Sequence, residues 1–267
     1  MKNKLVIVTG ASSGIGRACA KRFAQKGANI VLAARSTDKL HLVAEEISKL
    51  GVRVLVVSAD VSKEQDCRNL IDQTLSTFGR IDILVNNAGI SMRAILNDIE
   101  LDVLRKVMGV NFWGAVYCTK FALPALLESK GSVVGVSSIA GYKGLPGRTG
   151  YSSSKFAMHG FLESLRIENM KKGLHVLIAC PGFTASNIRS SALGGDGSSQ
   201  GETPRDEKMM MQPEEVADYI VEAVIKRKDR LTLTFNGKLT VLLNKFFPKL
   251  VDKLVYNHMS KEPGSPF

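Results

Sequence analysis

The sequence has few cysteines, and none of them lies close to another along the chain. Cys19, Cys67, Cys118 and Cys180 form no C-x-x-C pair, and the histidines have no metal-ligand companions at suitable spacing. Zinc sites and disulfide frameworks need such residues at short, regular intervals, so neither is indicated. We expect reduced, mostly buried thiols and a chemistry that needs no metal.

Long hydrophobic runs are also missing. No stretch of about 18 apolar residues occurs, and the apolar segment that follows MKNK is too short for a signal peptide. We therefore expect a soluble, cytoplasmic protein. The 267 residues, 45% of them hydrophobic, are enough for one large domain with a sizeable core.

Positive charge is in excess, but it gathers near the C-terminus. The net charge is +11, and residues 226–261 contribute nine Lys or Arg against two acids, a net +7. No zinc-finger, RNP-type or basic-zipper pattern accompanies this charge, which argues against a nucleic-acid-binding protein.

The same region has the pattern of a basic amphipathic helix. Apolar residues recur at helical spacing from Leu239 to Val255, with lysines on the other faces. We predict a helical extension over residues 238–267, broken or kinked near Pro248. It either packs on its own domain or a neighbouring subunit, or lies on an anionic membrane surface, with the protein then peripheral to the membrane.

Before this extension, short β-branched segments alternate with longer amphipathic ones. The expected strands cover residues 4–8, 29–34, 52–58, 82–86, 131–137 and 174–180. The expected helices cover residues 14–27, 38–50, 63–78, 99–129 and 151–172. This alternation predicts an α/β fold, a Rossmann-like doubly wound parallel sheet in one domain over residues 1–237. Ligands of such folds bind beyond the carboxyl ends of the strands.

One interval departs from the alternation. Residues 187–212 are rich in glycine, serine and charge, and poor in apolar anchors. Long irregular loops in compact domains are commonly functional or disordered, so this segment is either a substrate lid or a variable surface insertion.

A glycine-rich loop follows the first expected strand and opens a helix. In TGASSGIG, glycines permit a tight turn and let backbone N–H groups approach a pyrophosphate, which the helix N-terminus also favours. The candidate cofactor-binding residues of this loop are Gly10, Ser12, Ser13, Gly14, Ile15 and Gly16.

Tyr151 and Lys155 stand one helical turn apart in YSSSK. A tyrosine has an ordinary pKa of about 10 and needs help to exchange protons near neutrality. An ammonium on the same helical face favours the phenolate, so we expect Lys155 to lower the pKa of Tyr151. The pair would then act as a proton donor and acceptor.

The motifs together resemble the short-chain dehydrogenase/reductase family. They occur in the family's order over roughly residues 4–235: TGASSGIG, NNAG at 86–89, Asn111, Ser138, YSSSK and Pro181-Gly182. YxxxK alone is weak evidence, but the ordered set is specific. The resemblance implies hydride transfer between a nicotinamide cofactor and a carbonyl or alcohol carbon.

By this resemblance, Tyr151 is the general acid or base, and Lys155 holds the nicotinamide ribose and stabilises the phenolate. Ser138 contacts the substrate oxygen; the neighbouring Ser137 is the competing position. Asn111 resembles a helix asparagine whose backbone holds a water that connects the lysine to solvent. Its side chain could instead only stabilise a helix irregularity.

The resemblance also extends the cofactor site. Asn87, Ala88 and Gly89 would lie beside the cofactor, whereas Asn86 is interpreted as structural. Asp60 and Val61 resemble the pair that contacts adenine, although Asp60 could simply cap the next helix. The turn of Pro181 and Gly182 would lie against the nicotinamide. Thr184 or Ser186 would bind its carboxamide.

The second expected strand ends in Arg35 and Ser36, with no acid before Asp38. An acid at this place accepts hydrogen bonds from the ribose of NAD, whereas an arginine accommodates the extra phosphate of NADP, so we predict NADP(H) over NAD(H). Ser13 departs from relatives that carry a basic residue there. Arg17 would compensate only if it is not an ordinary solvated helix residue.

We expect a carbonyl reductase, or the reverse alcohol dehydrogenase, for a hydrophobic lipid-like, steroid-like or small ketone. The candidate pocket walls are Ile90, Met92, Ile139, Leu145, Phe183 and Met209 to Met211, although these methionines could equally be core residues. By resemblance alone, a homodimer or homotetramer forms through residues 99–129 and 151–172. The alternatives are an NAD-dependent alcohol dehydrogenase and a non-catalytic NADP-binding regulatory protein.

Overall fold

The computed structural model describes residues 1–186, 188–201 and 210–267. Its centre is a seven-stranded sheet of order β3-β2-β1-β4-β5-β6-β7 in which every pairing is parallel. The strands are β1 Leu5–Thr9, β2 Asn29–Ala34, β3 Val54–Ser58, β4 Ile83–Asn86, β5 Ser132–Val136, β6 His175–Cys180 and β7 Arg230–Thr232. The predicted doubly wound sheet is therefore confirmed, with one strand that the sequence analysis missed. That strand, β7, has only three residues.

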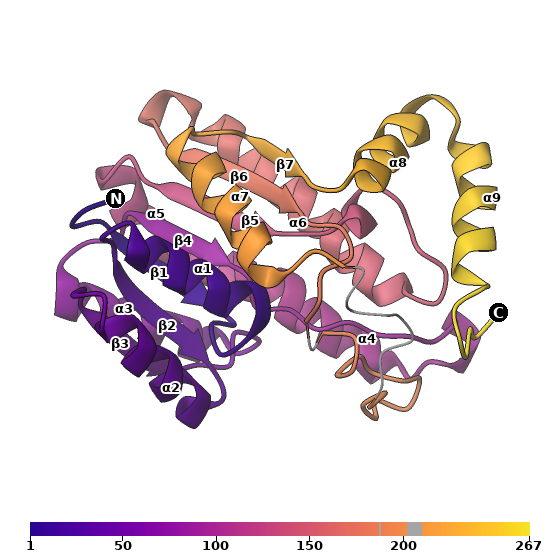
Figure 1. Ribbon diagram of the computed structural model, residues 1–267, viewed down its shortest axis with the longest axis horizontal. Coiled ribbons are helices and arrows are strands. Elements are labelled where there is room, and N and C mark those ends of the chain that lie inside the picture. Colours follow the sequence, from indigo (N-terminus) through magenta and orange to yellow (C-terminus); the bar gives the residue numbers. More distant parts are fainter. Residues whose placement is uncertain (187, 202–209) are drawn as a thin grey trace.

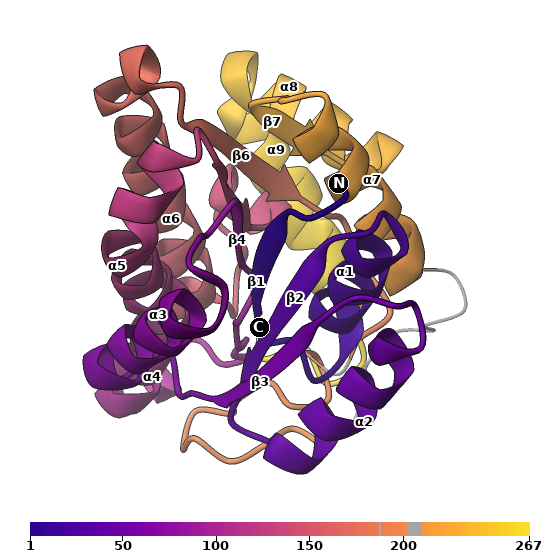
Figure 2. The ribbon, with the colours of Figure 1, turned by 90° about the vertical axis from the view of Figure 1, so that its left-hand side faces the viewer.

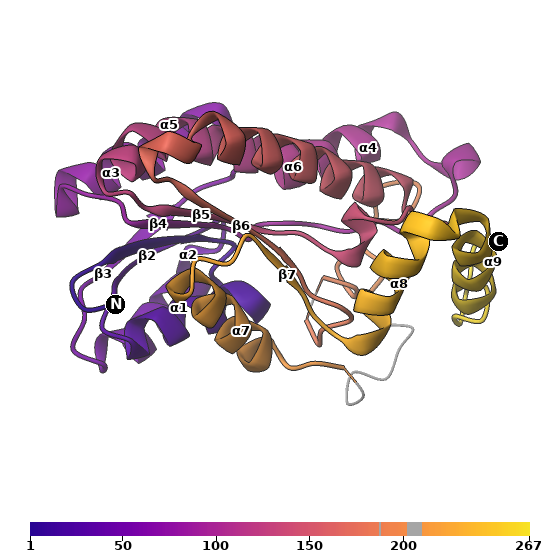
Figure 3. The same cartoon turned by 90° about the horizontal axis from the view of Figure 1, so that it is seen from above.

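Helices cover both faces of the sheet (Figures 2 and 3). One face carries α1 Gly14–Gln25, α2 Thr37–Ser48 and α7 Pro213–Ile225. The other carries α3 Glu64–Phe78, α5 Gly114–Glu128 and α6 Thr149–Glu168, with α4 Leu101–Met108 beside α6. Short helical turns occur at η1 Leu96–Asp98, η3 Ile139–Gly141 and η4 Met170–Lys172.

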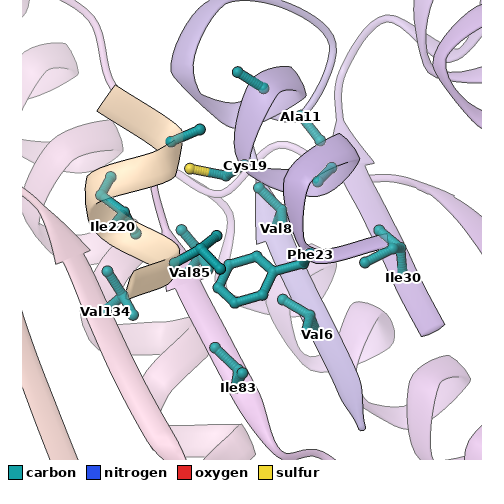
Figure 4. Packing of buried hydrophobic residues seen from close by; sticks show 14 of the residues in the cluster. Val6, Val8, Ala11, Cys19, Phe23, Ile30, Ile83, Val85, Val134 and Ile220 are labelled. Carbon is teal, nitrogen blue, oxygen red and sulfur yellow. The ribbon is translucent and has the colours of Figure 1, made fainter. Parts of the chain in front are cut away.

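Alternate residues of the interior strand β1 contribute to two separate cores. Val6 and Val8 of β1 point to the side of α1 and α7, while Leu5 and Ile7 point to the side of α3 and α5. In Figure 4, Phe23 of α1 lies against the strands on the first side. Burying such an aromatic side chain stabilises the fold by about 2–3 kcal/mol. All four cysteines are free and buried, as expected.

The expected helix 99–129 is divided in the structure. A π-helical turn, η2 Gly109–Trp113, separates α4 from α5. Such a turn has a wider hydrogen-bond ring than an α-helix and recurs at functional sites. Asn111 lies in this turn and is completely buried.

The C-terminal extension consists of two helices, α8 Phe235–Phe246 and α9 Pro248–Met259, with the predicted break at Pro248. Figure 1 and Figure 3 show both helices beyond one end of the sheet. Within the described part of the chain, no helix combines the length and hydrophobicity needed to cross a membrane.

Candidate active site

The carboxyl ends of β1 and β4 meet at the reversal point of the strand order, where doubly wound folds bind ligands. The side chain of Thr9 connects them, because its hydroxyl accepts hydrogen bonds from the N–H groups of Asn87 and Ala88, both at 3.0 Å. Asn87 Nδ2 donates in turn to the carbonyls of Thr9 (2.9 Å) and Gly10 (3.2 Å). The predicted NNAG segment thus fixes the glycine loop.

The glycine loop is shaped for close approach. Gly10 has a φ of +64°, and a Cβ there would lie 2.9 Å from the Cα of Ala88. A Cβ on Gly16 would lie 2.3 Å from the Gly10 carbonyl oxygen. Ser13, at the N-cap of α1, makes no side-chain capping hydrogen bond within the described residues. The first N–H groups of α1 therefore remain suited to an anionic group.

A cleft of about 770 Å³ runs along these strand ends. Nearly all of the predicted cofactor residues line it: Gly10, Ser12, Ser13, Gly14, Ile15, Arg35, Ser36, Asp60, Val61, Asn87, Ala88, Gly89, Pro181, Gly182, Thr184 and Ser186. Gly16 lies behind the loop and permits its close packing. The residues present therefore fit an elongated dinucleotide with phosphates at the N-terminus of α1.

Asp60 lies in the cleft and is not the cap of α3, whose N-cap residue is Lys63; its contact with adenine remains a prediction. The Oδ1 of Asp60 accepts hydrogen bonds from the N–H (3.0 Å) and hydroxyl (2.7 Å) of Ser62, just before α3. Burial raises the pKa of Asp60, but the Ser62 hydrogen bonds and the positive charge of Arg35 outweigh this and hold it below its ordinary value. The carboxylate is therefore a stable acceptor.

Ser138, Tyr151 and Lys155 line one end of the same cleft. Ser138 is the second residue after β5, and the other two lie on one face of α6. Lys155 is buried, and its Nζ donates to the carbonyl of Val136 at 2.9 Å and lies 5.7 Å from the centre of the Tyr151 ring. The three predicted side chains are thus brought together.

The expected lowering of the Tyr151 pKa is not what the structure has. Burial raises the pKa of Tyr151 above its ordinary value, while a hydrogen bond with Ser138 and the charge of Arg148 oppose this rise only in part. Burial also lowers the pKa of Lys155 to about 8. Desolvation thus outweighs the charge effect that the i,i+4 spacing suggested, because Lys155 is buried and Tyr151 is only partly exposed.

Asn111 supports the site from behind. Its Nδ2 donates to the Ile90 carbonyl and to the Ser154 hydroxyl, both at 2.9 Å, and its Oδ1 accepts from the Ile90 N–H at 2.8 Å. These bonds connect the π-helical turn, the NNAG segment and α6. The side chain therefore performs the structural role that was left open. The water relay remains a prediction.

The hydroxyl of Ser137, the competing position for the substrate contact, is paired with a buried histidine. This hydroxyl lies 2.8 Å from Nε2 of His159. His159 is buried behind the cleft, one turn beyond Lys155 on α6, and packs edge-on against Tyr142. Asn86 is likewise structural, because its Nδ2 donates to Thr119 on α5 at 2.9 Å.

Several cleft residues were not foreseen from the sequence. They are Ala34, Lys39, Ala59, Ser91, Val110, Val136, Arg148, Ile188, Arg189 and Ser191. Lys39 could have been found, since it is a basic residue only four positions after Arg35. Arg148 and Arg189 are both buried, and they come from loops whose course the sequence does not reveal.

The candidate wall residues divide between the cleft and the core, and their contact with a substrate remains a prediction. Ile90, Leu145 and Phe183 line the cleft, whereas Met92 is fully buried in a separate cluster and Ile139 contacts Gly237 of α8. Met209 lies outside the described residues.

The segment 187–212 is described in part. Ala192 and Leu193 are buried, and Leu193 bridges to Met92, which anchors this stretch. Residues 187 and 202–209 are not described, so the lid remains a prediction. Among the described residues, no group of three or more His, Cys, Asp or Glu side chains could hold a metal ion.

Comparison with known proteins identifies a family of similar sequences. A family model described as short chain dehydrogenase matches residues 4–194. The 11-beta-hydroxysteroid dehydrogenase A of Sesamum indicum is 37% identical over 98% of this chain and 77% of its own length. Dehydrogenase/reductase SDR family member 7B of Mus musculus is 35% identical over 99% of this chain and 84% of its own length.

A solved structure is also similar. The alcohol dehydrogenase of the archaeon Thermococcus sibiricus, complexed with 5-hydroxy-NADP, superimposes with a TM-score of 0.76 at 28% identity. The match covers 86% of this chain and 94% of that protein.

Proposed function

Because the chain belongs to the short-chain dehydrogenase family and is an oxidoreductase of alcohols and ketones, we propose that it is an NADPH-dependent carbonyl reductase for a hydrophobic ketone. The observation that carries the proposal is the meeting of Ser138, Tyr151 and Lys155 at one end of a cleft whose other residues form a dinucleotide cradle. A bound nicotinamide supplies or accepts the hydride.

The protein's own groups handle the proton and the substrate oxygen. Tyr151 donates its phenolic proton to the carbonyl oxygen as that oxygen becomes an alkoxide, and it takes the proton back in the reverse reaction. With its pKa raised by burial, Tyr151 carries its proton at neutral pH and so enters the reduction in the protonated form. The Ser138 hydroxyl stabilises the developing negative charge. Lys155, with a pKa lowered to about 8, is still largely an ammonium at neutral pH and favours the tyrosinate left behind.

Two cations support the preference for NADPH. Arg35 and Lys39 line the cleft beyond β2, whereas Asp38 does not line it. Arg17, the alternative cation, pairs with Glu46 at 2.8 Å and is not among the lining residues. A 2′-phosphate would therefore meet positive charge and little repulsion. The 5-hydroxy-NADP of the archaeal structure is in keeping with this assignment.

A hydrophobic substrate is supported by Ile90, Leu145 and Phe183 in the cleft wall. The names of the hydroxysteroid dehydrogenase relatives point in the same direction. Arg148, Arg189 and Ser91 at the same end add hydrogen-bond donors, so we favour a ketone that also carries acceptor oxygens.

The test is NADPH oxidation over a panel of ketones, with Tyr151→Phe as the decisive variant. We expect its kcat to fall by about 100-fold to 10,000-fold, while the Kd for NADPH stays within about twofold, since only the proton donor is lost. Tyr219→Phe, at a half-exposed position on α7, is the matched control and should behave as the parent protein. Equal turnover by Tyr151→Phe would refute the mechanism.

We also propose that the C-terminal extension lies on an anionic lipid surface. Phe235, Leu239, Leu242 and Phe246 follow helical spacing on α8 and are all exposed, and Phe247, Leu250 and Leu254 continue the exposed series into α9. Lys238, Lys245, Lys249 and Lys253 flank them. Two copies of this basic face would repel each other, whereas anionic headgroups would not. A homodimer or homotetramer would then form through α4, α5 and α6.

A further inference from the structure

The segment 139–148, between β5 and α6, joins the two halves of the catalytic set. Ser138 immediately precedes it, and Tyr151 follows it on the first turn of α6. Any displacement of this β5–α6 loop therefore changes the separation of the substrate-contacting serine and the proton donor. Such displacements matter, because a misplacement of about 1 Å can cost roughly 100-fold in rate.

The C-terminal helices hold the loop along its length. Three contacts do so: Ile139 with Gly237 of α8, the Tyr142 carbonyl with Asn244 Nδ2 at 3.1 Å, and Lys143 Nζ with Asp252 Oδ1 at 2.5 Å. Lys143 is charged and buried. Its ion pair with Asp252 of α9 offsets part of the free-energy cost of removing that charge from water.

The tail that follows α9 holds the end of the loop by charge. Glu262 is buried, with 5% of its side chain exposed, and its Oε2 lies 3.7 Å from Arg93 and 3.9 Å from Arg148. Arg93 also donates to the Pro263 carbonyl at 2.7 Å. The Phe267 ring lies where a Cβ on Gly147 would be 3.3 Å from it. Figure 1 shows this end of the chain beside the segment that precedes α4.

Arg148 connects the tail to the chemistry. It is the N-cap residue of α6, lines the cleft, and donates to the Ser91 hydroxyl and the Met92 carbonyl, both at 3.2 Å. Burial raises the pKa of Tyr151, and the positive charge of Arg148 opposes that rise. A carboxylate from the far end of the sequence thus faces an arginine that belongs to the active site.

The loop is also a thin wall. Leu145 lines the main cleft and a second cavity of about 640 Å³ on the other side. That second cavity is bounded by Asp252, Val255 and Tyr256 of α9. With a cavity on each side of Leu145, the position of this part of the wall depends strongly on the attachments of the loop at Lys143 and Arg148.

We propose that Glu262 is a positioning residue that, through Arg148, holds the β5–α6 loop in place. The loop held in this way closes the ketone end of the cleft. The inference rests on the proposed function for its kinetic consequence. Its structural consequence, a loop held by the tail, does not depend on turnover.

The experiment compares the full-length Glu262→Gln variant with Lys261→Gln, which alters one charge at the adjacent exposed position. In Glu262→Gln the two arginines lose their shared counter-charge, and the loop loosens. We expect the KM for a ketone to rise by about tenfold and kcat to change less, with the Kd for NADPH within about twofold. Lys261→Gln should leave all three constants unchanged. Amide hydrogen exchange within residues 139–148 should be faster in Glu262→Gln only.

The outcomes separate the two hypotheses. Unchanged exchange in the loop together with an unchanged KM would overturn the positioning role. A parallel loss of NADPH affinity would also overturn it, because it would show general destabilisation. If no ketone is reduced by the parent protein, the proposed function fails, while the exchange comparison still decides whether Glu262 holds the loop.

Discussion

At the residue scale, cofactor choice depends on the side chains that follow β2. Arg35 and Lys39 both line the cleft, and both are exposed, so they can rearrange around a phosphate at little cost in stability. Arg35 lies just before the N-cap of α2 and Lys39 lies in its first turn, so both flank the start of this helix. Two cations at one site bind a phosphate more strongly than either alone.

We therefore predict that Arg35→Asp reverses the cofactor preference. The carboxylate would repel a 2′-phosphate and accept hydrogen bonds from the ribose hydroxyls, so affinity for NADPH should fall by about 100-fold and affinity for NADH should rise. Lys39→Gln should cause a smaller loss. The measurement is the Kd of each cofactor by fluorescence titration.

Arg17→Gln is the informative comparison. Its guanidinium pairs with Glu46, so the preference for NADPH should persist in this variant. A preference that survives in Arg35→Asp but disappears in Arg17→Gln would show that the second strand does not set cofactor choice here.

At the scale of the element, α6 presents three groups at successive intervals of four residues: Tyr151, Lys155 and His159. The first two reach the cleft. His159 lies deeper, beside the hydroxyl of Ser137 and 3.6 Å from the thiol of Cys180. It connects the ends of β5 and β6 beneath the catalytic residues, so its neutral form is part of the folded structure.

This histidine should make stability depend on pH. Burial, aided by the charges of Arg230 and Lys155, lowers the pKa of His159 from 6.5 to about 4. Between these values the unfolded chain binds a proton that the folded protein does not, so acidification favours unfolding. We predict that the free energy of unfolding of the parent protein falls between pH 7 and pH 5 by about 1–2 kcal/mol more than that of His159→Gln. This figure allows for partial solvation of the ring.

Urea unfolding at the two pH values measures this difference. His41→Gln, at an exposed position on α2, is the control and should keep the pH dependence of the parent protein. An identical pH dependence in His159→Gln would mean that the buried ring is protonated in the folded state.

The strands and helices could be predicted where local sequence patterns determine them, but not where contacts between distant residues do. The alternation of segments predicted six of the seven strands, and nearly all of the cofactor residues predicted from the ordered motifs line the cleft. The division of residues 99–129 at a π-helical turn was missed, since the turn is stabilised by contacts of Asn111 with Ile90 and Ser154 that are distant in sequence. Arg148 was missed for the same reason. Its partners Ser91 and Glu262 are more than about 50 residues away on either side, beyond the reach of local patterns.

At the scale of the whole molecule, the C-terminal extension has one face that is exposed to solvent and another that packs against the domain. Val251, Met259 and Glu262 are buried. The apolar side chains that are exposed are Phe235, Leu239, Leu242, Phe246, Phe247, Leu250 and Leu254. The predicted amphipathic pattern therefore divides into two faces. The inward face accounts for self-packing, and the outward face leaves an exposed apolar area of the kind that marks an interaction surface.

The lipid proposal predicts binding to vesicles that contain an anionic lipid. We expect the protein to co-sediment with mixed phosphatidylserine and phosphatidylcholine vesicles at low salt, and far less with phosphatidylcholine alone. Replacing Leu242, Phe246 and Leu250 by serine should reduce partitioning by at least tenfold, because each side chain removed from water contributes about 1–2 kcal/mol. These positions are at least 49% exposed, so the fold should persist, unlike in a truncation that would remove Glu262.

Leu42→Ser and Ile167→Ser form the matched control, since both positions are apolar, more than 60% exposed and distant from the extension. They should leave vesicle binding unchanged. Because Phe183 of the cleft wall lies 6.4 Å, centre to centre, from the His258 ring of α9, a docked extension would place the ketone end of the cleft near the lipid. Equal sedimentation of the serine variant and the parent protein would assign the exposed series to contact with another subunit instead.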